Sequence, residues 1–171
     1  LGDPGIQAVD IRDPAAPVPV GDVVGTSGDC RDLALEGGLL YVADGAAGIG
    51  VLDVSDPARA RAVGVLRTPR LSRSVAVRGG WLFVGERNDL EYGVWVVDAR
   101  DPAHPRGVAF ADVEGGGDGV AVRGDLVYVA ALRPYAVGAQ VNTPYVGVVD
   151  VSDPEHPKVE RQVQAAPVAT G

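Results

Sequence analysis

The sequence has one cysteine, two histidines and no methionine among 171 residues, and these scarcities exclude several kinds of chemistry. Cys30 cannot form a disulfide within the chain, and there is no CxxC pair to ligate zinc. We expect Cys30 to be a small, half-buried apolar residue at the start of a strand. The HExxH signature of metalloproteases and the GxSxG signature of serine hydrolases are also missing. The sequence therefore implies no metal and no cofactor.

Long apolar runs, helical periodicity and excess positive charge are missing as well. No run of about 18 apolar residues occurs, so no membrane span is predicted. No window shows the 3.6-residue period of a long amphipathic helix. Acidic residues outnumber basic ones by 23 to 15, which disfavours a nucleic-acid or anionic-membrane partner. With 24 glycines and 13 prolines, the composition is typical of an all-β protein.

A motif that does recur is an apolar run followed by Asp-Pro. Its copies AVDIRDP, VLDVSDP, VVDARDP and VVDVSDP end at Pro14, Pro57, Pro102 and Pro154, which are 43, 45 and 52 residues apart. The Val, Ile and Leu residues predict a strand packed on both faces. The aspartate accepts a local backbone hydrogen bond and the proline fixes φ, so each copy predicts a turn after the strand. In three copies a second proline follows, which predicts an edge strand next.

The residues between these motifs complete a four-stranded unit. Gly-Gly pairs between apolar runs predict tight hairpins. The aromatic residues Tyr41, Phe83 and Tyr128 of the second strand are 42 and 45 residues apart. Four short strands in a period near 43 residues are typical of a propeller blade. A β-sandwich is the alternative, but it would not need such a regular repeat.

We therefore predict an all-β fold, a β-propeller fragment of about three and a half four-stranded antiparallel blades. It forms one segment over residues 1–171, made of an outer half-blade (1–28), a blade (29–70), a second blade (71–115) and a third blade (116–171). An insertion between the second and third strands of the last blade covers residues 132–145. Because the first unit lacks an inner hairpin and the chain begins at Leu1, we expect an arc that needs a partner or the remaining blades of a parent chain.

The motifs also resemble a known family. YVADG followed by VLDVSDP, and again VVDVSDP, is similar to the LVIVD repeat of bacterial and archaeal proteins associated with the cell surface and with export. The resemblance covers essentially the whole chain, although Gly85 and Glu86 stand where the family has Ala-Asp and the third copy carries the insertion. It implies a β-propeller and an extracellular or cell-surface location. The family has no well-defined common activity, so no mechanism is implied.

Candidate binding residues lie on the face where the loops vary in length, since loops held by rigid strands are the usual site of recognition. One candidate is the turn of residues 44–48. The others are Glu86, Arg87 and Asn88 in a second loop, and Arg133, Tyr135, Asn142 and Tyr145 in or beside the insertion. The alternative interpretation is that these are solvated loops that vary in length and bind nothing.

A second group, Arg31, Asp32, Arg73 and Asp118, is predicted at the starts of the inner strands, at the mouth of the central channel. Two arginines there would hold an anionic ligand by bidentate hydrogen bonds. Salt bridges between blades, to Asp29 or Asp32, are the alternative.

Two other recurring residue types are expected to be structural. The aspartates Asp10, Asp53, Asp98 and Asp150 recur in every unit, so each should satisfy nearby backbone donors. His104 and His156 occupy the same position in different blades, which places them too far apart for a shared metal or catalytic site.

From the sequence we expect a non-catalytic binding or scaffold module that recognises a protein or a small ligand through its loops. The alternatives are a propeller enzyme with a site at the channel mouth and a set of purely structural blades.

Overall fold

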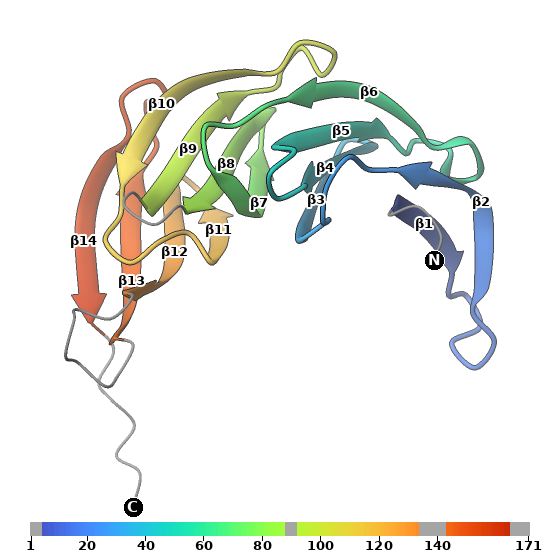
Figure 1. Cartoon of the computed structure of the whole chain (residues 1–171), viewed down its shortest axis with the longest axis horizontal. Coiled ribbons are helices and arrows are strands. Elements are labelled where there is room, and N and C mark those ends of the chain that lie inside the picture. Colours follow the sequence, from blue (N-terminus) through green and yellow to red (C-terminus); the bar gives the residue numbers. More distant parts are fainter. Residues whose placement is uncertain (1–4, 88–91, 134–142, 165–171) are drawn as a thin grey trace, which may run out of the picture.

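The computed structural model describes residues 5–87, 92–133 and 143–164. These residues form β-strands joined by short turns, with one turn of 3-10 helix, η1 (Pro57–Arg59). The strands make four separate antiparallel sheets, which follow one another along an open arc in Figure 1. None of the described elements is a helix that could span a lipid bilayer.

Each sheet contains strands that are consecutive in the chain. Sheet A pairs β1 (Gly5–Asp10) with β2 (Val18–Gly25). Sheet B consists of β3 (Asp32–Glu36), β4 (Leu39–Ala43), β5 (Ile49–Asp53) and β6 (Arg61–Leu66). Sheet C consists of β7 (Leu71–Arg78), β8 (Trp81–Arg87), β9 (Tyr92–Asp98) and β10 (Arg106–Asp112). Sheet D consists of β11 (Gly119–Arg123), β12 (Leu126–Arg133), β13 (Thr143–Asp150) and β14 (Lys158–Gln164).

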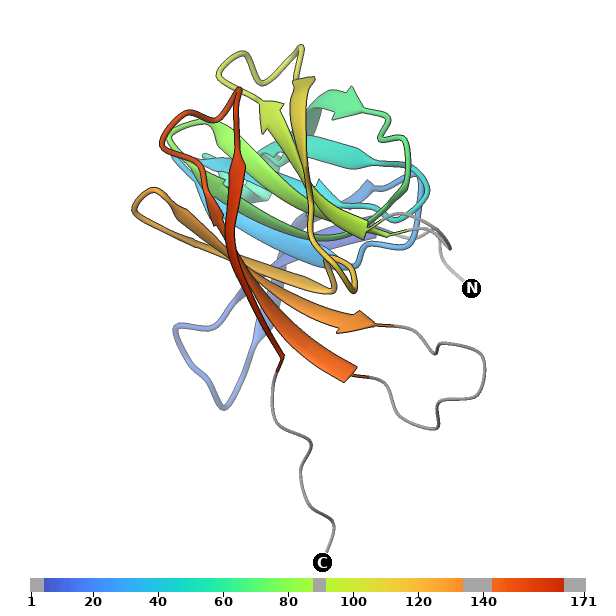
Figure 2. The ribbon, with the colours of Figure 1, turned by 90° about the vertical axis from the view of Figure 1, so that its left-hand side faces the viewer.

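This arrangement confirms the predicted fold class. Sheets B, C and D each hold four strands in chain order, and sheet A holds two. The first strands of neighbouring four-stranded sheets, β3, β7 and β11, contact one another, and the last strands form outer edges. Figure 2 shows the tilt of successive sheets in the view turned by 90°.

Local chemistry explains the strand boundaries. Gly37 and Gly38 have φ values of +58° and +81°, the left-handed conformation that a two-residue hairpin turn needs and that glycine adopts without steric cost. At the Asp-Pro turn after β5, the Asp56 carboxylate accepts a hydrogen bond from the Ala58 amide at 3.1 Å and caps η1. In sheets B, C and D the register between the last two strands shifts at the same place, just before the last two residues of the third strand. In sheet A the register shifts earlier in β1, between Ile6 and Ala8.

The core consists of contacts between the flank of one sheet and the opposing flank of the next. We call the flank that faces the following sheet the back flank and the other the front flank. Tyr41, Ile49 and Val51 on the back flank of sheet B join one buried cluster with Val75, Leu82, Val84 and Val97 of sheet C. Phe83, Val94 and Val96 of sheet C join a second cluster with Val127, Val129 and Val149 of sheet D. Both flanks of sheet C are covered, so its central strands are apolar on both faces.

Cys30 differs from the expectation. It is exposed and has a free thiol, because it lies in the connection before β3 rather than under a neighbouring sheet.

Candidate functional site

The ends of the sheets present two faces with different chemistry. One of them, which we call the loop face, holds the connections between successive sheets (residues 67–70 and 113–118). The ends of the second strands and the starts of the third strands lie there too. There Gly45 forms an isolated β-bridge with Ser72, which joins sheet B to the start of sheet C. The opposite face, which we call the turn face, carries the hairpin turns and the Asp-Pro turns. The sequence placed its candidate site on the loop face.

On the loop face, two arginines converge on one carboxylate. Nε of Arg73, on β7, lies 2.7 Å from Oδ1 of Asp118, and Nη1 of Arg87, at the end of β8, lies 3.4 Å from Oδ2 of the same residue. All three side chains are partly exposed, by 32%, 27% and 21% for Arg73, Arg87 and Asp118. The Arg87 guanidinium lies 5.8 Å from the centre of the Tyr92 ring. The cluster carries two positive charges and one negative charge.

Glycines allow the two sheets to approach closely beside this cluster. A Cβ on Gly117 would lie 2.4 Å from the Cα of Gly85, and a Cβ on Gly85 would lie 2.3 Å from the Gly117 carbonyl oxygen. The Ser74 hydroxyl donates a hydrogen bond to that carbonyl at 2.9 Å. The connection 113–118 is therefore held against β8, which fixes Asp118 between the arginines.

Glu86 lies at the same end of β8 but is fully buried. Its carboxylate forms an ion pair with Arg70 at 3.6 Å, and the Arg70 guanidinium lies 4.4 Å from the centre of the Phe110 ring. Burial raises the pKa of Glu86 to about 7, against the opposing effects of Thr68 and Arg70. Glu86 is thus a buried group between the connection 67–70 and sheet C, rather than an exposed loop residue as predicted.

The remaining predicted site residues do not join the cluster. Arg31 pairs with Asp29 in its own connection, not with another sheet. Asp32 accepts a hydrogen bond from the Val75 amide at 3.0 Å and so links the first strands of sheets B and C. Tyr145 is half-buried on β13. Arg133 ends β12, while Asn88, Tyr135 and Asn142 lie outside the described residues.

One pairing was missed from the sequence. Arg73 pairs with Asp118, whereas Asp29 or Asp32 was the predicted partner, because the start of sheet D and not of sheet B faces it. Asp44 accepts hydrogen bonds from the Ser27 and Gly28 amides at 2.9 and 2.8 Å and ties the connection before sheet B to its loop face. Asp44 belongs to the YVADG segment and begins the turn 44–48, which the sequence predicted as a candidate.

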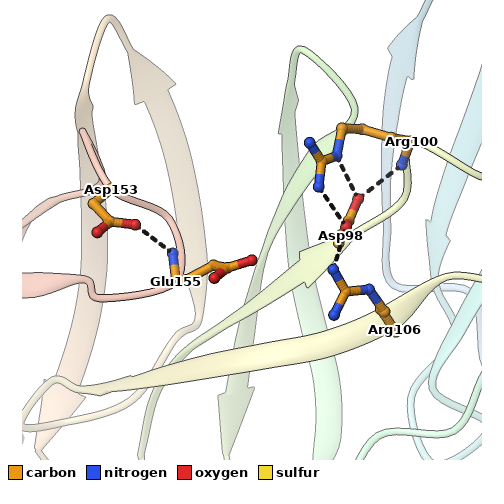
Figure 3. A network of polar contacts seen from close by, with 5 residues as sticks. All are labelled: Asp98, Arg100, Arg106, Asp153 and Glu155. Carbon is orange, nitrogen blue, oxygen red and sulfur yellow. Dashed lines mark hydrogen bonds and ion pairs between the residues drawn. The ribbon is translucent and has the colours of Figure 1, made fainter.

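The turn face shows how the recurring aspartates are used. Asp98 accepts hydrogen bonds from the Arg100 amide and guanidinium and from Arg106 (Figure 3). These contacts hold the pKa of Asp98 below its usual range, Arg100 contributing most. The other three recurring aspartates also accept a hydrogen bond from a backbone amide. The donors are Arg12 for Asp10, Ser55 for Asp53 and Ser152 for Asp150. The expectation that each satisfies a nearby backbone donor is confirmed.

The histidines belong to the same turns. Nδ1 of His104 lies 3.0 Å from Asp101, and Nδ1 of His156 lies 2.9 Å from Asp153. Each pair is local to its own sheet. Among the described residues, no group of three or more His, Cys, Asp and Glu side chains is placed to hold a metal ion.

Comparison with known proteins identifies the repeat. The family model described as the LVIVD repeat matches residues 27–68 and 69–109, which correspond to sheets B and C with their preceding connections. None of the curated proteins compared matches the chain.

Proposed function

Because the chain contains two LVIVD repeats, we propose that it is a non-catalytic binding module of an exported or cell-surface protein and that it recognises an anionic group through its loop face. The observation that carries this proposal is the cluster of Arg73, Arg87 and Asp118. The other blades of a parent propeller are proposed as its structural partners.

The charges support an anionic ligand. Each arginine contacts Asp118 through one nitrogen, whereas a guanidinium offers five N–H donors. Both side chains are partly exposed, so their other donors can reach a carboxylate or phosphate group from solvent. In a chain with a formal charge of −8, a local excess of positive charge is a distinct feature.

The turn face offers a contrast. There Arg100 and Arg106 also converge on one carboxylate, that of Asp98. However, Arg100 donates to Asp98 through both Nε and Nη2, at 2.9 and 2.8 Å, and its guanidinium lies over the Trp81 ring. These arginines stabilise their own turn. The loop-face pair is held by fewer contacts and is the better candidate for recognition.

The enzyme alternative would need a carboxylate with a raised pKa in an accessible pocket. Glu86 has the raised pKa, but its side chain is fully buried. A binding role is therefore the better supported of the two.

The test uses a fluorescein-labelled hexaglutamate peptide as the anionic probe, with hexaglutamine as its neutral counterpart, at 0.15 M salt. Fluorescence polarisation should show binding of the anionic probe alone, and the Arg73→Gln/Arg87→Gln variant should bind at least about tenfold more weakly. The matched control is Arg100→Gln/Arg106→Gln, which makes the same change in net charge on the turn face. Equal losses in the two variants, or no binding by the wild-type protein, would contradict the proposal.

A further inference from the structure

The two strands of sheet A match the outer half of a complete sheet. β1 ends at Asp10 before an Asp-Pro turn, as β5 ends at Asp53, β9 at Asp98 and β13 at Asp150. β1 pairs antiparallel with β2, as β5 pairs with β6, although the register shifts earlier in β1 than in β5. In sheets B, C and D the strand equivalent to β1 pairs with a second strand on its inner edge. Among the described residues, β1 pairs with β2 alone.

An apolar groove lies beside that inner edge. It has a volume of about 420 Å³ and lies between Ile6, Ala8 and Val24 of sheet A and Leu35, Leu40 and Leu52 of sheet B. The groove therefore occupies the place that the inner strands of a complete sheet fill elsewhere in the arc.

Exposed side chains on the front flank of sheet B indicate which kind of segment would cover the groove. Leu33 is 45% exposed, whereas Val75, at the same repeat position in sheet C, is 4% exposed. Leu35 is 65% exposed, whereas its counterpart Val77 packs against the buried cluster between sheets B and C. In that cluster the covering side chains on sheet B include Ala34 of β3 and Tyr41 of β4. The uncovered surface is therefore the area that a hairpin equivalent to β3 and β4 would cover.

We propose that the groove and the free edge of β1 receive a β-hairpin with the pattern of residues 32–43, completing sheet A to four strands, with an aromatic ring at the position equivalent to Tyr41 filling the groove. Backbone hydrogen bonds to β1 would supply affinity, and the alternate side chains would supply specificity. The occupant is a segment that is not already part of a sheet. A second copy of this chain is a poorer occupant, because its own hairpins of this pattern are paired within sheets B, C and D.

The experiment adds a labelled peptide, RDLALEGGLLYVAD (residues 31–44), to the full chain. Saturable binding by fluorescence polarisation is expected, together with slower hydrogen exchange of the β1 amides. A Tyr41→Ala change in the peptide should weaken binding at least about tenfold, because the groove would be left partly unfilled. In the protein, Leu35→Asp should weaken binding by a similar factor. Val163→Asp, an exposed position on β14 at the other end of the arc, is the matched control and should have no effect.

Three outcomes would overturn the proposal. The first is no binding at millimolar peptide. The second is binding that Leu35→Asp and Val163→Asp weaken equally. The third is self-association of the chain that Leu35→Asp abolishes and that the peptide does not compete with, since the occupant would then be a second copy.

Discussion

Tyr41 and Tyr128 occupy the same position in two repeats, yet Tyr41 is 1% exposed and Tyr128 is 38% exposed. The difference arises because sheet C covers the back flank of sheet B, whereas no described residue covers the back flank of sheet D in the same way. Burial in this arc is therefore a property of neighbouring sheets, and a residue's repeat position alone does not determine it.

This pair gives a prediction about stability. Tyr41→Ala should lower the free energy of unfolding by about 3–5 kcal/mol, the cost of removing a large aromatic side chain from a packed core. Tyr128→Ala should cost less than about 1 kcal/mol, since its ring is already in contact with solvent. Urea denaturation of both variants measures the difference. Equal losses would show that the flanks of sheets B and D are equally covered.

Glu86 predicts a pH-dependent contribution to stability. Its pKa is raised from 4.5 to about 7 in the folded protein, so the folded state retains the proton while the unfolded state loses it. The stabilising contribution is present below about pH 4.5 and is lost as the pH rises towards 7, by at most about 3 kcal/mol. Glu86→Gln cannot ionise. The stability of this variant relative to the wild type should therefore increase between pH 5 and pH 8, and a constant difference in denaturation midpoint would contradict the assignment.

Asp98 predicts the opposite pH dependence. Its folded-state pKa is depressed by Arg100 and Arg106, so its contribution is present above the unfolded pKa and is lost as the pH falls through the folded one. Asp98→Asn should cost about 1–3 kcal/mol at pH 7, the usual value of hydrogen bonds to a charged group, and less at pH 3. Thermal unfolding at the two pH values measures the change. A cost at pH 3 equal to that at pH 7 would argue against charge as its source.

Glu36 links two sheets on the turn face. Its carboxylate accepts hydrogen bonds from the Gly79 and Gly80 amides, both at 2.9 Å, and so anchors the hairpin of sheet C to sheet B. Glu36→Ala should destabilise the protein by about 1 kcal/mol. Arg123 holds the equivalent position at the exposed end of sheet D, so Arg123→Ala is the matched control and should change the stability little. Hydrogen exchange at Gly79 and Gly80 should quicken in the first variant only.

Much of the fold could be predicted from the sequence because its signals are local. The Gly37-Gly38 pair sets a hairpin by its backbone conformation alone, and Asp56-Pro57 sets a turn through a hydrogen bond two residues away. The spacing of the aromatic residues then gives the number of repeats. None of these inferences depends on how the sheets are oriented relative to one another.

The candidate site was harder to predict because its contacts cross between sheets. Asp118 was placed correctly at the start of a strand, but its pairing with Arg73 and Arg87 depends on how closely β8 approaches the connection 113–118. Glu86 looked like a solvated loop residue, since charged side chains are seldom fully buried. Its burial follows from the packing of the connection 67–70 over the end of β8.

The account depends on one arrangement, in which the back flank of each sheet packs on the front flank of the next along an arc. A crystal structure of the chain is the most direct test. We predict that Tyr41 and Phe83 will be sealed between successive sheets and that one rotation will relate sheet B to sheet C and sheet C to sheet D. Sheets stacked face to face in pairs, with Tyr128 sealed and Tyr41 open to solvent, would contradict it.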